Sequence, residues 1–156
     1  MTDEKHAILM GEIRYAERLT QRTARLYRRA ATLFTFLTII GGSATVSALS
    51  DRVPNWVSLS GVVLMGLVGA LALAMRPLEK AIANEAEVRK YSQLRTAGHA
   101  MSVAELQAAL AKAQETDTAE VEALRAVAYN DVVTEIGRED KLISLTAHQR
   151  LVAAIA

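Results

Sequence analysis

The hydrophobic and polar positions of the chain are dominated by two apolar segments. Residues 30–50 and residues 55–75 are each 21 residues long and contain no Asp, Glu, Lys or Arg. At 1.5 Å per residue, such a helix spans roughly 31 Å, the thickness of the hydrocarbon core of a bilayer. Helices of this length in soluble proteins nearly always carry a polar stripe or a charge. The pattern therefore predicts two transmembrane helices rather than a pair of buried core helices.

The segments around these helices fix their predicted orientation. Residues 51–54 make a loop so short that the two helices must be antiparallel neighbours, which puts both termini on one side. In residues 1–29, Lys and Arg outnumber Asp and Glu by seven to four, whereas the loop carries only Arg52, offset by Asp51. The positive-inside rule therefore places both termini in the cytoplasm. Because the first apolar segment starts late and is longer than a signal-peptide core, we interpret it as an uncleaved anchor.

The rest of the chain has helical patterns. Residues 1–29 are predicted to form a cytoplasmic helical arm that continues into the first span, since no Gly or Pro occurs between Glu12 and Ile40. The apolar side of this arm needs a partner helix, which we expect from the C-terminal part. Residues 76–156 are predicted to form a cytoplasmic helical module, in which Pro77 kinks the helix leaving the second span without ending it.

Helix start and stop signals divide this C-terminal module. Ser102 and Asp117 each stand three residues before a Glu, which predicts a capping box at the start of two helices, and Gly137 suits the position after a helix end. Helices are expected from Arg76 to about Thr96, from Ser102 to about Gln114, from Asp117 to about Ile136 and from about Asp140 to Ile155. No strand pattern is present. The predicted fold class is an all-α membrane protein: a two-helix transmembrane hairpin with a long N-terminal helical arm and C-terminal cytoplasmic helices.

Composition excludes several classes of chemistry. The chain has 156 residues, a net charge of +1 and no cysteine, which removes disulfide scaffolds, cysteine-ligated metals and thiol catalysis. The near-neutral charge argues against a nucleic-acid partner. The three histidines are far apart, and no nucleotide-binding, hydrolase or metalloprotease motif is present. We therefore expect no enzyme activity, no catalytic residue, no metal ligand and no cofactor.

Arginines of the N-terminal arm recur at spacings of four, four, three and four, which places them on one helical face. The residues are Arg14, Arg18, Arg22, Arg25 and Arg29. Arginines next to a membrane bind anionic headgroups and fix topology. The alternative is that this arginine face contacts a partner or an anionic signal.

Small and hydroxyl-bearing residues recur within the apolar segments. A helix-packing or oligomer seam is predicted from Thr35, Thr38, Gly42 and Thr45 of the first segment and from Gly66, Ala70 and Ala74 of the second. Helices associate in lipid through close packing of small residues and through Ser/Thr hydrogen bonds. A second weakly polar face, which would line any aqueous lumen, consists of Thr32, Ser43, Ser47 and Ser50. A single hairpin uses one face of each helix for packing. The second weakly polar face of the first segment therefore favours a homo-oligomer over packing within one hairpin.

The chain resembles the SLATT family, which comprises two-transmembrane effector domains found beside nucleotide-signal synthases and SLOG sensor domains in bacterial conflict systems. The resemblance rests on the arm RYAERLTQRTARLYRRAATLF (Arg14–Phe34), on the coupled hairpin of residues 30–75 and on the helix Glu79–Leu94 with its Tyr91. It implies a homo-oligomeric inner-membrane effector that assembles on a signal from an upstream protein or ligand. Such an effector perturbs or permeabilises the membrane in antiviral defence. It implies no catalytic residues, and no sensor domain of that kind is recognisable in the sequence.

Two other functions stay open at the level of sequence. The chain could be a non-conducting membrane scaffold or phage-encoded accessory protein that recruits partners through the helices between Val103 and Ile136. It could also be a channel for a physiological ion, which is the least favoured because no ring of charged residues lies within the apolar segments. The number of subunits, the conductance and the trigger are not encoded in any pattern that we can interpret.

Overall fold

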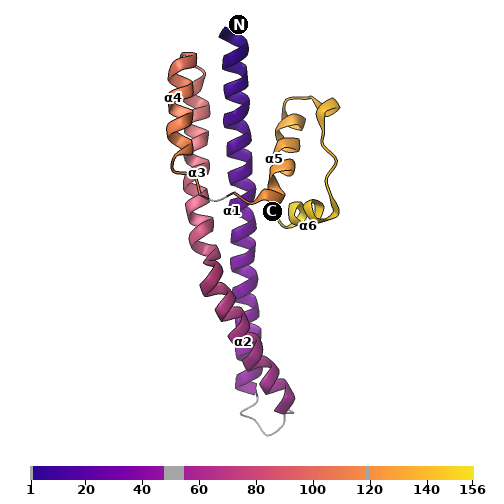
Figure 1. Cartoon of the computed structure of the whole chain (residues 1–156). Coiled ribbons are helices and arrows are strands. Elements are labelled where there is room, and N and C mark those ends of the chain that lie inside the picture. The colour runs from indigo at the N-terminus through magenta and orange to yellow at the C-terminus, as the bar shows by residue number, and fades with distance from the viewer. Residues whose placement is uncertain (1, 48–54, 119) are drawn as a thin grey trace. The chain divides into compact units, whose positions relative to one another are not determined.

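The computed structural model describes residues 2–47, 55–118 and 120–156, and every regular element in these ranges is a helix. The elements are α1 (Thr2–Ser47), α2 (Asn55–Met75), α3 (Pro77–Gly98), α4 (Val103–Gln114), α5 (Glu122–Glu135), the 3-10 turn η1 (Glu139–Lys141) and α6 (Ala147–Ile155), all labelled or traceable in Figure 1. The prediction of an all-α protein is confirmed. The predicted loop of residues 51–54 and the end of the first apolar segment, residues 48–50, lie outside the described residues.

The chain forms two compact units. The first unit comprises Met1–Leu26 and Ala81–Ala156, and the second unit comprises Tyr27–Lys80. Helices α1 and α3 each contribute residues to both units. The boundary on α1 falls close to residue 29, where the predicted arm meets the first apolar segment.

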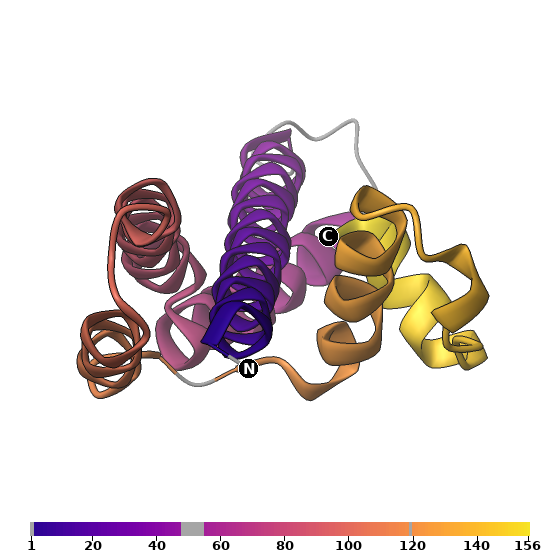
Figure 2. The same cartoon turned by 90° about the horizontal axis from the view of Figure 1, so that it is seen from above.

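In the first unit, the N-terminal part of α1 lies between two layers of helices. Figure 2 shows α3 and α4 on one side of it and α5 and α6 on the other. One buried cluster joins α1, α3 and α4 through Met10, Ile13, Tyr91, Leu106, Leu110 and Ala113. A second joins α1, α5 and α6 through Leu19, Leu124, Val127, Ala128 and Ala156. The apolar side of the arm therefore finds the C-terminal partner helices that its pattern predicts.

Helix ends in this unit follow the capping chemistry of the sequence in two places. Ser102 accepts a hydrogen bond from the backbone N–H of Glu105, and the Glu105 carboxylate accepts one from the backbone N–H of Ser102 at 2.9 Å. Gly137 follows the end of α5 with a φ of 70°, a value that favours glycine. Its N–H donates to Thr134 O and that of Arg138 to Val133 O, which is the Schellman pattern.

The predicted helix start at Asp117 is wrong. Helix α5 begins at Glu122, because Asp117 serves as a partner of α3. It accepts a hydrogen bond from the Tyr91 hydroxyl and another, at 2.7 Å, from Lys90 Nζ. Glu87 of α3 accepts a further bond from the linker backbone at 2.7 Å. These carboxylates fasten the α4–α5 linker to α3, so the Asp117 side chain is not available to cap a helix.

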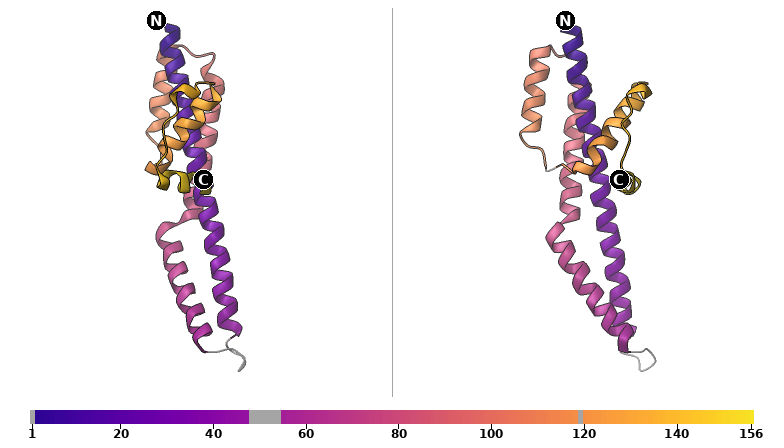
Figure 3. Two further views of the ribbon diagram at one scale, coloured as in Figure 1. Left: turned by 90° about the vertical axis from the view of Figure 1, so that its right-hand side faces the viewer. Right: turned by 45° about the vertical axis from the view of Figure 1, so that its right-hand side comes forward.

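The continuous helix predicted from Asp140 to Ile155 is also wrong. The segment between η1 and α6 is not helical because Ile143 exchanges two backbone hydrogen bonds, of 2.9 and 2.8 Å, with the side-chain amide of Asn130. A capping box that the sequence reading missed then starts α6, since Thr146 accepts from the N–H of Gln149 at 3.2 Å and the reciprocal bond is 2.9 Å. Figure 3 shows that this linker returns α6 towards the start of α5.

In the second unit, α1 and α2 pack through a narrow face of small residues. Gly41 and Gly61 are buried, and Val68 is 4% exposed. A Cβ atom added to Gly41 would lie 2.7 Å from Met65 Cγ and 3.2 Å from the carbonyl oxygen of Gly61. Glycine at position 41 therefore permits the helices to approach, and a larger side chain would separate them.

Arg76 forms the junction between α2 and α3. Its φ is 43°, which is unfavourable for a residue with a side chain, and Pro77 is the first residue of α3, where its missing N–H costs nothing. The backbone still makes helical bonds across the junction, from Arg76 N to Ala72 O and from Lys80 N to Arg76 O, at 3.0 and 3.1 Å. The sequence predicted a kink at Pro77 in a continuing helix; the structure instead ends α2 before Arg76 and starts α3 at Pro77, with helical hydrogen bonds across the break.

Among the residues described, one helical stretch, Leu59–Gly98, is long and apolar enough to cross a membrane by length and composition. Only 11% of its apolar window is buried. A core helix of a soluble protein would be mostly buried, and this stretch is mostly exposed.

Burial predicts how two matched leucine substitutions differ. Leu124 is fully buried between α1 and α6, whereas Leu151 of α6 is 62% exposed. We expect Leu124→Ala to lower the free energy of unfolding by about 2–5 kcal/mol, because it leaves a cavity. Leu151→Ala should change it by less than about 0.5 kcal/mol. Thermal unfolding of the full chain in detergent, followed by circular dichroism, measures both, and equal effects would contradict the assigned core.

Candidate functional site

Two residues of the arginine face of α1, Arg18 and Arg22, lie against α5 in the first unit. Arg18 Nη2 is 2.7 Å from Glu135 Oε2. Arg22 makes a bidentate pair with Asp131, at 2.8 Å from Nε to Oδ2 and 3.0 Å from Nη2 to Oδ1. Arg22 also donates to the carbonyl oxygen of Ala153 in α6, at 3.5 Å. Two of the predicted lipid- or partner-binding arginines therefore have acidic partners within the chain.

The register of these pairs reflects two antiparallel helices. Arg18 and Arg22 are four residues apart on α1, and Glu135 and Asp131 are four residues apart in the opposite order on α5. Because residues at i and i+4 share a helical face, equal spacing lets both pairs form at once. The four-residue spacing of Asp131 and Glu135 matches that of Arg18 and Arg22, and it is the sequence signal by which these two partners could have been predicted.

Glu135 is the centre of this charge network. Arg95 of α3 lies 3.9 Å from Glu135 and 3.1 Å from Glu17 of α1. The hydrogen bond from Arg18 holds the pKa of Glu135 below its usual value of 4.5, against a desolvation effect in the opposite direction. The charges of Arg18, Arg14 and Arg95 lower it further. The network thus connects α1, α3 and α5.

The other arginines of this face have different surroundings. Arg14 has a buried Nε without a hydrogen-bond partner within the described part of the chain. Arg25 is exposed and lines an open cavity of about 350 Å³ together with Arg18 and Arg22. Arg29 is exposed and belongs to the second unit. The structure therefore brings four of the five predicted arginines together in the first unit.

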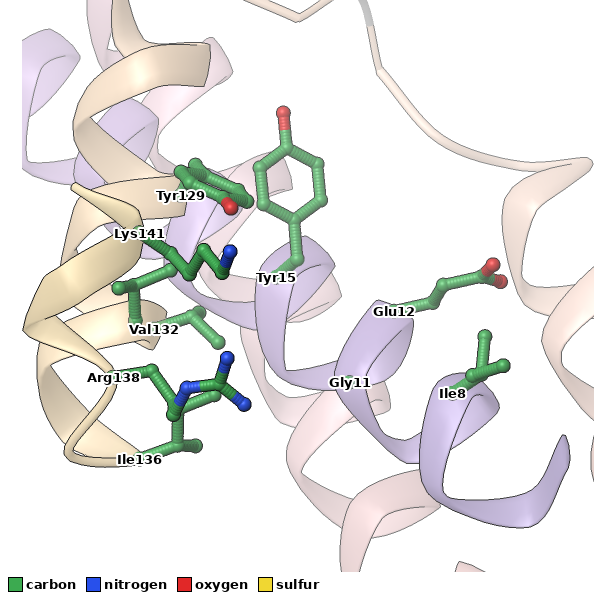
Figure 4. Close-up of a pocket in the computed structure, with 10 residues that line it drawn as sticks. Ile8, Gly11, Glu12, Tyr15, Tyr129, Val132, Ile136, Arg138 and Lys141 are labelled. Atoms are coloured by element: carbon green, nitrogen blue, oxygen red, sulfur yellow. The ribbon is translucent and has the colours of Figure 1, made fainter. Parts of the chain in front are cut away.

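A separate groove lies between α1 and α5, as Figure 4 shows. Its volume is about 380 Å³, and its walls include the exposed apolar parts of Ile8, Tyr129 and Ile136. Burial raises the pKa of the Tyr15 hydroxyl on the α1 side, with a smaller contribution from the charge of Glu120. No residue of this groove was predicted as a site, since its halves are about 120 residues apart in the sequence.

The predicted helix-packing seam is not the contact between α1 and α2. The hydroxyl groups of Thr35 and Thr38 are exposed and donate to Ala31 O and Phe34 O of their own helix, at 3.0 and 2.8 Å. Gly42 is only partly buried; a Cβ placed there would lie 3.8 Å from Met65 Sδ. The side chain of Thr45 is outside the described part of the structure.

The second half of that seam lies on exposed surface of α2. Gly66, Ala70 and Ala74 are all exposed, and a Cβ added to Gly66 would meet no atom within 4 Å. Within one chain, none of the three is buried against another helix of the described second unit. Gly41 and Gly61 make the close contact instead, and the sequence reading had not assigned Gly41 to it.

The predicted lumen face is exposed where it is described. The hydroxyls of Thr32 and Ser43 donate to Arg28 O and Ile39 O, at 3.1 and 2.8 Å. The side chain of Ser47 and the whole of Ser50 fall outside the described residues. No hydroxyl of this set that the structure describes makes a hydrogen bond between helices.

The histidines and carboxylates of the described ranges form no metal-binding cluster. No three His, Asp or Glu side chains come together there in a way that could hold a metal ion. His6 has a structural partner, because its Nε2 hydrogen-bonds the carbonyl oxygen of Gly98 at 2.9 Å.

Comparisons with family models, with curated proteins and with solved structures give no match for this chain. The resemblance to the SLATT family stays an expectation drawn from the sequence.

The lowered pKa of Glu135 predicts how acid affects the first unit. A carboxylate with a lowered pKa stabilises the fold above its unfolded pKa, and this contribution is lost as the pH falls through the folded value. We expect Glu135→Gln to lower the melting temperature at pH 7, with an effect of at most about 1 kcal/mol because both partners are about one-third exposed. The difference from the wild type should shrink below pH 4.5. Thermal unfolding from pH 7 to pH 3 measures it.

Glu122→Gln is the control for this prediction. Glu122 lies on the same helix, and its side chain is 81% exposed beside Arg125. Its substitution should leave the melting temperature nearly unchanged at every pH. A Glu135→Gln effect that grows as the pH falls would contradict the assigned pairing.

Proposed function

We propose that the chain is a homo-oligomeric inner-membrane protein that perturbs or permeabilises the membrane. Residues 30–50 and 55–75 would form its transmembrane hairpin, with both termini in the cytoplasm. The observation that carries the proposal is the exposure of large apolar side chains in the second unit. They are Leu33, Phe36, Ile39, Ile40, Trp56, Leu59, Val62, Val63, Met65, Leu67, Leu71, Leu73 and Met75. Water-soluble proteins rarely expose apolar surface of this extent, and a bilayer would cover it.

The polar groups of these segments are compatible with lipid. The hydroxyls of Thr32, Thr35, Thr38 and Ser43 each donate to a carbonyl oxygen four residues earlier. Such internal bonds satisfy the donors without water, and backbone groups within a bilayer must likewise be satisfied internally. The apolar segments can therefore enter lipid without unpaired hydroxyl protons at these positions.

Self-association is supported by the unused surface of α2. Gly66, Ala70 and Ala74 follow one another at intervals of four residues and are exposed. In lipid, small residues at this spacing let a second helix approach closely. Two helices per chain cannot enclose an aqueous path, so permeabilisation requires several copies.

The setting in bacterial antiviral defence rests on the resemblance to the SLATT family. The first unit, with its charge network, would hold the assembly and respond to an upstream protein or ligand. We infer neither a cofactor nor a nucleic-acid partner.

A second candidate function is a non-conducting scaffold that recruits a partner protein through its cytoplasmic helices. The groove of Figure 4 favours it, because Ile8, Tyr129 and Ile136 expose apolar surface beside α5. In this case the hairpin would only anchor the chain, and vesicles containing the assembled protein would stay sealed.

Topology reporters test the membrane hairpin. A fluorescent protein fused after Ala156 should fluoresce, whereas alkaline phosphatase at the same position should be inactive, because both termini are proposed to be cytoplasmic. Phosphatase inserted after Arg52 should be active. Extraction of the chain by alkaline carbonate, or an active C-terminal phosphatase, would contradict the proposal.

Leakage from vesicles tests the effector function and the small-residue stripe. The wild-type chain in liposomes should release an entrapped dye. Gly66→Leu should reduce both release and crosslinked oligomer to near background, because the larger side chain prevents close helix approach. The matched control is Gly69→Leu, which lies about 60° away around the helix. A Cβ at Gly69 also meets nothing within 4 Å.

The control variant should leak like the wild type. Sealed vesicles with an intact oligomer would favour the scaffold function. Leakage that is unaffected by Gly66→Leu would contradict the assigned interface.

A further inference from the structure

A wide crevice opens between α1 and the junction of α2 with α3, within the second unit. Its volume is about 720 Å³. The wall on α1 includes Phe34 and Ile39, and the opposite wall includes Leu73 and Leu78. Apart from the buried Pro77, the apolar side chains that line it are partly or largely exposed, up to 78% for Leu73.

The hydroxyl groups that line the crevice are already satisfied. Thr35 and Thr38 line it, but their hydroxyls donate to carbonyl oxygens of α1. Pro77, also in the lining, has no N–H to offer. The interior therefore presents apolar surface and hydroxyl oxygens without free protons, which suits a hydrocarbon chain better than a polar ligand.

One end of the crevice is cationic. Arg76 lines it, and its ion pair with Glu79 is 3.4 Å long between side chains that are 68% and 71% exposed. An exposed pair of this length binds weakly and leaves the guanidinium able to bind another anion. Lys80, one turn further on, lies over the ring of Tyr27 at 5.3 Å. Arg28 lies one turn before the lining residue Ala31 of α1.

We propose that this crevice binds an acyl chain of an anionic phospholipid, with the lipid phosphate at Arg76. The apolar walls and the cationic end match the two parts of such a molecule. An empty crevice in a bilayer would forfeit dispersion contacts along both walls, and anionic headgroups are attracted to cations at the cytoplasmic surface. Small residues also line the crevice, namely Ala31, Thr35, Thr38 and Ala72, so occupation by a second copy of the chain is the outcome that the reporter below must distinguish from lipid. The inference rests on the proposed membrane insertion.

Quenching of a tryptophan in the crevice by brominated lipids tests this site. Trp56 is the only tryptophan of the chain, so Trp56→Phe with Leu73→Trp places one reporter in the crevice. In mixed bilayers, brominated phosphatidylglycerol should bind beside it about fivefold more strongly than brominated phosphatidylcholine. Adding Arg76→Gln should reduce this preference to near one.

Two matched controls separate the site from general lipid contact. The reporter Leu71→Trp, on a neighbouring lipid-exposed position of α2 that does not line the crevice, should show no preference between the lipids. Thr35→Phe, which fills the crevice, should abolish the preference, whereas Thr32→Phe outside it should not.

The possible failures are distinguishable from those of the proposed function. Equal quenching by both lipids at Leu73→Trp, in a chain that inserts and leaks, overturns the lipid site alone. A reporter shielded from both lipids in an intact oligomer would mean that a second copy fills the crevice, which also overturns it. A chain that carbonate extracts from the membrane refutes the proposed insertion first.

Discussion

Two packed helices can bury only one face of each, and this constraint governs the second unit. Where α1 and α2 meet, Gly41 and Gly61 bring the backbones so close that a Cβ on Gly41 would strike Met65. Such a contact buries little beyond the glycines and Val68. The large apolar side chains around both helices consequently stay exposed within the described residues of this unit. Lipid or further copies of the chain are the partners whose chemistry fits, and the proposals on insertion, self-association and the lipid crevice all follow from that need.

The first unit is under a different constraint, because its helices carry many charged side chains and must still bury an apolar core. Apolar contacts place α5 and α6 on α1, and the pairs Arg18–Glu135 and Arg22–Asp131 fix the register. Each pair is partly exposed and contributes little by itself. Their value lies in specificity, since a shift of α5 by one residue would break both pairs together. Salt weakens such pairs more than it weakens apolar contacts, so the attachment of α5 to α1 should be the salt-sensitive part of this unit.

The sequence allowed the helical class, the capping box at Ser102 and the stop at Gly137 to be predicted, because each depends on local chemistry. Predictions failed where a distant residue competes for the same group. Asp117 has the spacing of a helix cap, yet Tyr91 and Lys90 bind its carboxylate. The arginine face was identified from the regular spacing of its residues along the sequence. That spacing does not reveal which residues of another helix the arginines will contact. Likewise, the rotation of α1 about its axis decides that Gly41 and not Gly42 makes the closest contact with α2. Successive residues are about 100° apart around a helix, so only one of the two glycines can face α2.

The hydroxyl groups of the apolar segments limit what kind of path an assembly could form. A selective ion pathway needs charged rings or arrays of carbonyl oxygens that replace the hydration shell. In the described part of α1, Thr32 and Ser43 have their protons bonded to carbonyl oxygens of the same helix. They would offer only weakly polar oxygen atoms to a lumen, and neither apolar segment carries a charge. Any opening built from these surfaces would distinguish solutes mainly by size, which fits a membrane-damaging effector better than a channel for one physiological ion.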